Sequence, residues 1–210
     1  MRAAEQPVSL AATLWRANTP EAERILAHGF VRGLGDGTLP VDCFKSYVAQ
    51  DAYFLEAFAR AYAFCLANST TREDLNDFAD LIASVRDELA LHKAYAERWQ
   101  VDLIDVVPLA ATRAYVDFLL SIARRGNLGE TIAAMTPCMR LYAFLGRALS
   151  AGPVVPLYAD WVKTYADPGF EALAVRLEAL LDRHATNTEA VRANYARAMD
   201  LEYGFFDANL

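Results

Sequence analysis

Apolar residues recur at helical spacing through almost the whole chain, and this periodicity limits the fold more than any other feature. In the segment from 47 to 58, for example, Tyr47, Phe54 and Phe58 fall on one side of a helix. We find no segment that alternates apolar and polar residues as a half-buried β-strand does. Proline, glycine and asparagine separate the helical stretches at short intervals. An all-α fold is therefore predicted.

These breakers divide the chain into roughly eight predicted helices. Pro20 is expected to open one helix, whereas Gly33, Gly35 and Gly37 are expected to form a loop. Long helices joined by short turns form a bundle. No linker or repeat interrupts them, so a single helical domain over residues 1–210 is expected. The other predicted helices cover residues 40–68, 71–100, 112–125, 129–150, 153–165, 168–184 and 188–207.

The charge balance argues against nucleic acid or membranes as partners. The formal net charge is −7, and no run of basic residues occurs. A nucleic-acid-binding surface needs clustered positive charge, and so does attachment to anionic lipid. No uncharged apolar stretch is long enough for a membrane span. Residues 1–7 include an acid and a proline where a signal peptide has its apolar run, so a cytoplasmic protein is expected.

Metal and cofactor motifs are not found. His28, His92 and His184 lie far apart, and no Glu-x-x-His pair of the di-iron bundles occurs. Glu88 and His92 are four residues apart, and a surface or structural pair is the favoured interpretation. Three cysteines without a CxxC pair do not indicate a disulfide framework or a zinc site. The glycines at 33–37 lack the GxGxxG spacing and a preceding strand, which favours a plain turn.

Cys138 follows a proline within a predicted helix. Pro137 removes one backbone hydrogen bond, to the carbonyl of Ala133, and is expected to kink the helix. A kink can turn Cys138 toward a cavity, with Tyr142 one turn later on the same face. Judged by these residues alone, a buried and inert cysteine is the stronger interpretation.

Two carboxylates lie within apolar helical faces. Asp51 precedes Phe54 and Phe58 by three and seven residues, and Glu202 precedes Phe205 by three. An acid is rarely buried without a partner because desolvation is costly. A buried acid with a raised pKa also suits general acid–base catalysis. Exposure at a helix edge explains each acid equally well.

Several short sequence motifs occur in a fixed order along the chain and together indicate a particular family. They are Gly33–Pro40 leading to Phe44 and Tyr47, Gln50–Leu55, Glu88–His92, Pro137-Cys138 with Tyr142, Trp161–Tyr165, and Glu202–Asp207. In this order and at these intervals, over nearly the whole chain, they resemble the TenA family, the thiaminase II group of the haem-oxygenase-like helical fold. Cys138 implies the cysteine-bearing branch of that family.

The resemblance implies roles for seven residues. Cys138 would be the catalytic nucleophile, Glu202 the acid–base carboxylate, and Asp51 the residue that binds the aminopyrimidine. Phe54, Tyr115, Tyr142 and Tyr165 would form the aromatic pocket. No metal, nucleotide or flavin would be required.

The implied activity is hydrolysis of 4-amino-5-aminomethyl-2-methylpyrimidine to the hydroxymethylpyrimidine and ammonia, and cleavage of thiamine to the hydroxymethylpyrimidine and its thiazole. Thiamine salvage would be the role, and a homotetramer the assembly. Two alternatives stay open at this stage. One is a haem-binding or haem-degrading protein with His28 as the ligand. The other is a non-catalytic pyrimidine-binding or regulatory protein, which would have no use for Cys138 together with Glu202.

Overall fold

The computed structural model describes residues 9–210, apart from the side chain of Leu91, and this part of the chain contains helices but no strand. The predicted all-α class is therefore confirmed. None of these helices combines the length and apolarity needed to cross a membrane. The elements are α1 (Leu10–Leu26), α2 (Gly29–Asp36), α3 (Val41–Asn68), α4 (Arg72–Trp99), α5 (Ala110–Ala123), α6 (Leu128–Ser150), the short 3₁₀ helix η1 (Pro156–Tyr158), α7 (Ala159–Ala166), α8 (Pro168–His184) and α9 (Glu189–Ala208).

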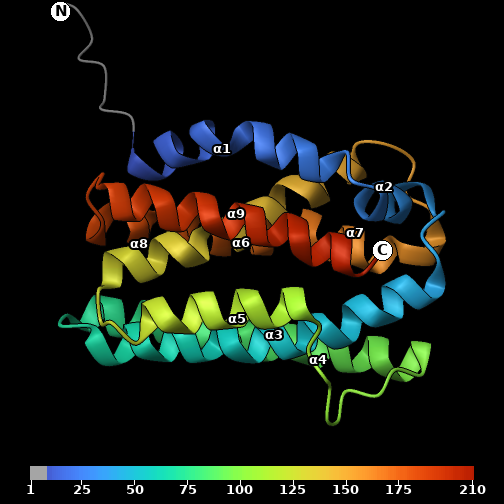
Figure 1. Ribbon diagram of the computed structural model, residues 1–210, viewed down its shortest axis with the longest axis horizontal. Helices are drawn as coiled ribbons and strands as arrows, with labels where there is room; N and C mark the ends of the chain where they lie inside the picture. The colour runs from blue at the N-terminus through green and yellow to red at the C-terminus, as the bar shows by residue number, and fades with distance from the viewer. Residues whose placement is uncertain (1–8) are drawn as a thin grey trace, which may run out of the picture.

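The helices pack in two layers (Figure 1). One layer contains α3, with α4 and α5 packed against it; the other is centred on α6, which contacts α7, α8 and α9. The first helix, α1, covers α9 on the side away from α3. Contacts of α5 with α6 and α9, and of α3 with α6, join the layers. Buried aromatic rings fill the space between them, and the candidate site lies there.

Polar side chains cap the N-termini of several helices. The side chains of Ser9, Thr71, Asn127 and Thr188 each accept a hydrogen bond from a backbone N–H in the first turn of the following helix. Such caps satisfy donors that have no partner within the helix. The long helices therefore start close to where the sequence places them.

The predicted start at Pro20 is wrong, because Pro20 lies inside α1. The helix begins at the Ser9 cap and continues past the proline. Leu14, Ala22 and Ile25 are all buried along one face that spans it. Packing of this continuous apolar face compensates for the single backbone hydrogen bond that Pro20 cannot make.

The predicted glycine loop is also wrong in part. Gly33 and Gly35 lie within α2, and only Gly37 adopts a left-handed conformation, with φ of 78° at the helix end. A Cβ atom on Gly33 would lie 2.8 Å from the backbone nitrogen of Leu39. Gly33 therefore permits close packing rather than a turn. Farther along the chain, the helix expected from Pro153 begins only as η1 and continues as α7.

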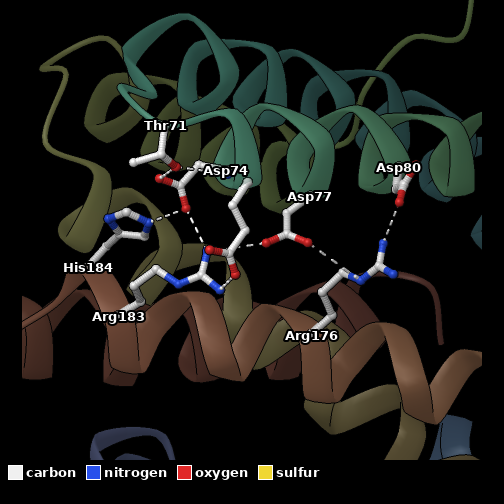
Figure 2. A network of polar contacts seen from close by, with 8 residues as sticks. Thr71, Asp74, Asp77, Asp80, Arg176, Arg183 and His184 are labelled. Carbon is white, nitrogen blue, oxygen red and sulfur yellow. Dashed lines mark hydrogen bonds and ion pairs between the residues drawn. The ribbon is translucent and has the colours of Figure 1, made fainter.

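Charged side chains join α4 to α8 (Figure 2). Arg183 Nη1 donates to Asp74 Oδ1 at 2.7 Å, and His184 Nε2 lies 2.8 Å from the same oxygen. Nearer the middle of both helices, Arg176 Nη1 donates to Asp80 Oδ2 at 2.9 Å. The network fixes the antiparallel register of the two helices, which reach the candidate site farther along the same line of contact.

Candidate active site

A narrow cavity lies between the two layers, and its volume is about 10 Å³. Five of the seven residues predicted from the sequence line it, namely Asp51, Phe54, Cys138, Tyr142 and Tyr165. Leu55, Phe58, Glu88, Met139 and Phe170 complete the lining. The remaining two predicted residues, Tyr115 and Glu202, lie directly behind it.

Cys138 and Glu202 are neighbours although they come from α6 and α9. Helix α6 continues across Pro137, whose missing N–H leaves the carbonyl of Ala133 without its helical donor, and Cys138 follows on the same helix. The Cys138 thiol and the Glu202 carboxyl are close enough for each to shift the pKa of the other. Tyr115 donates its hydroxyl proton to Glu202 Oε1 at 2.8 Å, which orients the carboxyl group.

Burial changes the acidity of both groups. It raises the pKa of Glu202 to about 7, although the hydrogen bond from Tyr115 and the neighbouring Cys138 thiol oppose the rise. Burial raises the pKa of the Cys138 thiol well above its usual range, and the charges of Glu202, Asp51 and Glu88 add to it. The resting group is therefore a thiol, and it needs a base before it can act as a nucleophile. Glu202 is the adjacent base.

One carboxyl oxygen of Asp51 is hydrogen-bonded within the protein, and the other is not. His92 Nε2 lies 2.7 Å from Asp51 Oδ2, and the Tyr47 hydroxyl lies 3.3 Å from the same atom. Trp161 Nε1 donates to the Tyr47 hydroxyl at 3.1 Å, which fixes that ring in turn. No hydrogen bond within residues 9–210 engages Asp51 Oδ1, so this oxygen is available to a ligand in the cavity.

Burial sets the protonation states of Asp51 and His92. Burial raises the pKa of Asp51 well above its usual range, the nearby Glu88 and Glu202 carboxyls add to the rise, and the bond from Tyr47 opposes it. Burial lowers the pKa of His92 to about 4, so the imidazole is neutral near pH 7. A carboxyl group of raised pKa can share a proton with a weakly basic ring nitrogen.

Aromatic rings form the walls of the cavity. The Phe54 and Tyr115 rings are 4.5 Å apart, and the Tyr142 and Tyr165 rings meet edge to face at 4.7 Å. A Cβ atom on Gly146 would lie 2.3 Å from the carbonyl carbon of Tyr165. Only glycine at this position of α6 lets α7 approach closely enough to place Tyr165 in the wall.

The expected pairing of Glu88 with His92 is wrong. His92 contacts Asp51, whereas Glu88 Oε1 accepts a hydrogen bond from the Tyr165 hydroxyl at 2.8 Å. Both residues face the site because they extend the buried stripe of α4. The signal was present in the sequence: Phe78, Leu81, Val85, Glu88 and His92 follow one another at intervals of three and four residues.

The residues that follow Cys138, and the haem-ligand candidate His28, have contacts that explain their positions. Met139 lines the cavity, but Arg140 points away from it and donates to Glu178 and Glu171 on α8. His28, the haem-ligand candidate, accepts from the Phe30 N–H through Nδ1 and contacts Asp207 through Nε2. Both of its ring nitrogens are therefore engaged. In the region from 9 to 210, no three His, Cys, Asp or Glu side chains are grouped as a metal site requires.

Comparison with known proteins identifies the family. The sequence pattern of the TENA/THI-4/PQQC family matches residues 9–210. The chain belongs to this family. The resemblance seen in the sequence is thereby confirmed, and the whole cavity lies within the matched region.

Relatives within the TENA/THI-4/PQQC family carry enzyme names. The chain is 35% identical to an aminopyrimidine aminohydrolase of Halalkalibacterium halodurans, over 85% of this chain and 83% of that protein. It is 32% identical to an aminopyrimidine aminohydrolase of Bacillus subtilis, over 98% of this chain and 89% of that protein. A crystal structure described as a TenA family transcription regulator, from Silicibacter sp. TM1040, superposes with a TM-score of 0.88 at 27% identity, over 98% of this chain and 99% of that one.

Proposed function

We propose that this protein is an aminopyrimidine aminohydrolase that breaks the C–N bond at the exocyclic methylene of 4-amino-2-methylpyrimidines. The substrates are 4-amino-5-aminomethyl-2-methylpyrimidine, which yields the hydroxymethylpyrimidine and ammonia, and thiamine, which releases its thiazole. The names of the relatives support this activity. One observation carries the proposal: a thiol paired with a carboxyl of raised pKa, and a second carboxyl with a free oxygen, belong to one aromatic cavity.

The aromatic lining of the cavity suits a flat heteroaromatic ring, which enters once the side chains move apart. Phe54, Tyr142 and Tyr165 offer faces and edges against which a pyrimidine packs. Asp51 Oδ1 is the polar group available to the edge formed by the ring nitrogen and the 4-amino group. A proton shared between Asp51 and that nitrogen leaves positive charge on the ring, which makes its C6 carbon more electrophilic.

Cys138 and Glu202 then carry the bond changes. As the sulfur adds to C6, the thiol proton passes to Glu202, and the electron pair of the broken ring double bond expels the amine from the methylene carbon. Glu202 passes the thiol proton to the departing nitrogen, so that ammonia leaves and the Glu202 carboxylate is restored. Water, deprotonated by Glu202, adds to the methylene carbon. Loss of the sulfur from C6 returns the proton to the thiol and restores the aromatic ring.

A protein that only bound the pyrimidine would need Asp51 and the aromatic walls. It would have no use for a half-buried thiol next to a buried carboxyl, because removing an ionisable pair from water costs free energy. The pair of Cys138 and Glu202 therefore favours catalysis over regulation by binding alone.

The experiment is direct. The purified protein is incubated with thiamine and, separately, with the aminomethylpyrimidine, and the products are separated by chromatography. The proposal requires hydroxymethylpyrimidine from at least one substrate without added metal or cofactor. Absence of this product from both reactions would contradict it.

We also expect a homo-oligomer, a tetramer by the family resemblance, working in the cytoplasm on thiamine degradation products. The segment between α4 and α5 supports self-association, because Ile104 and Val107 are 77% and 78% exposed there. Light scattering coupled to size-exclusion chromatography tests the assembly, and a monomeric mass would contradict it.

A further inference from the structure

Glu88 occupies the neck of the cavity. It lines the inner cavity together with Cys138, and it also lines a wider pocket that opens to the surface between α4, α7 and α8. Phe170 is the other residue shared by the two. The outer pocket has a volume of about 450 Å³, against about 10 Å³ for the inner one. Its other lining residues are Ser84, Asp87, Lys163, Thr164, Asp167 and Leu173.

The α4–α8 register explains why the opening is there. The ion pairs of Figure 2 hold the two helices together up to Asp80 and Arg176. Farther along, Ser84 and Leu173 face the outer pocket instead of each other, and Glu88 and Phe170 follow. A substituent on a ring held in the narrow inner cavity has this route toward the surface.

Glu88 has no positively charged partner among residues 9–210. Its single hydrogen bond is the one that Oε1 accepts from Tyr165 at 2.8 Å, and no Lys, Arg or His of the described region lies within 4.0 Å of the carboxyl group. The inner lining contains no Lys or Arg, and Asp51 is close enough to feel the Glu88 charge. Burial raises the pKa of Glu88 to about 7. A cation at the neck would relieve this excess of negative charge.

The leaving groups of the proposed substrates are cations. An alkylamine on the methylene carbon is protonated near pH 7, as a lysine side chain is, and the thiazolium ring of thiamine carries a permanent charge. We propose that Glu88 binds the positive charge of the leaving group at the neck and thereby selects cationic over neutral substituents. This inference rests on the proposed function.

The test compares two ligands that share one ring and differ in charge. Calorimetry measures the dissociation constants of the aminomethylpyrimidine, a cation, and the hydroxymethylpyrimidine, which is neutral. The Cys138→Ser background keeps the first ligand intact during the titration. Changing Glu88 to Gln should lower the preference for the cation by about tenfold, the size of one charge-assisted hydrogen bond. Affinity for the neutral ring should change by less than about twofold.

Two further variants control the result. Glu88→Asp keeps the charge and should keep most of the preference. Glu97→Gln removes an exposed carboxyl from the same helix and should change nothing. An unaltered preference in Glu88→Gln, or an equal loss for both ligands, would overturn the inference while leaving the proposed function intact. If the parent protein bound neither ring, the proposed function itself would be refuted, and the inference with it.

Discussion

His92 Nε2 lies 2.7 Å from Asp51 Oδ2, and the other nitrogen of the same buried imidazole has no hydrogen-bond partner within residues 9–210. The imidazole is therefore committed to Asp51 alone, and it positions the carboxyl so that Oδ1 remains free. The pair joins α3 to α4 directly beneath the cavity.

Changing His92 to Phe should weaken binding of the hydroxymethylpyrimidine by about tenfold, because Asp51 loses its principal hydrogen bond. His92→Gln, which returns an N–H donor near the position of Nε2, should recover part of the affinity. Calorimetry on both variants, with circular dichroism to verify folding, makes the measurement. Equal affinities of the His92→Phe and His92→Gln variants for the ring would show that the bond to Asp51 has no positioning role.

Asp51→Asn should weaken ring binding and slow turnover together. The amide keeps the shape of the side chain but cannot share a proton with the ring nitrogen as a carboxyl does. A lost charge-assisted hydrogen bond corresponds to about 1.5–3 kcal/mol. Binding and kinetics measured on the same preparation test this, and a variant normal in both would remove Asp51 from the site.

Glu202→Gln should lower kcat by a factor on the order of 10²–10⁴ and affect ring binding much less. Because the carboxyl must be ionised to take the thiol proton, and burial raises its pKa to about 7, kcat of the unmodified protein should rise with pH through about 7. Residual activity of the variant should lack that rise, whereas Glu88→Gln should retain it. A rise that persists in Glu202→Gln would assign the titration to another group.

Ionisation of the buried Glu202 carboxyl should lower the free energy of unfolding at high pH. Its pKa is raised from 4.5 to about 7 in the folded chain, so the folded state binds the proton more tightly than the unfolded state does. The contribution of Glu202 to the free energy of unfolding is fully present below about pH 4.5. It is lost as the pH rises through about 7, a change of about 3 kcal/mol.

Glu202→Gln, which cannot ionise, should therefore gain in melting temperature relative to the unmodified protein between pH about 5 and pH about 8, by several degrees. Glu97→Gln, at an exposed position of α4, is the matched control and should show no such gain. A constant difference between the Glu202→Gln and unmodified melting temperatures at both pH values would mean that Glu202 is not a buried carboxyl of raised pKa.

The helices and most of the site were predictable from the sequence because their signals are local. Apolar periodicity marks α3, α4 and α6, polar caps mark the starts of α4 and α6, and the ordered motifs mark Cys138 and Glu202. The errors arose where packing between elements decides the outcome. Pro20 stays inside α1 because a buried face continues past it, and Gly33 serves a close approach to Leu39.

The polar residues of α4 illustrate the same limit. Glu88 and His92 lie on one helical face, and their spacing alone suggests that they pair with each other. Periodicity shows that a polar residue faces inward, but not which side chain of another helix meets it. Asp51 and Tyr165 take these roles because α3 and α7 flank α4, an arrangement that no local pattern contains.

The central claim is that Cys138 attacks the pyrimidine with Glu202 as its base, and single-turnover hydrolysis by Cys138→Ser tests it most directly. Serine is nearly the same size, and the walls and Asp51 are unchanged, so the hydroxymethylpyrimidine should bind with nearly unaltered affinity. The serine hydroxyl is far less acidic than a thiol, so the rate should fall by at least about a thousandfold, or about 4 kcal/mol of barrier. A folded Cys138→Ser protein that hydrolyses the aminomethylpyrimidine at the unmodified rate would contradict the covalent route and leave Glu202 activating water directly.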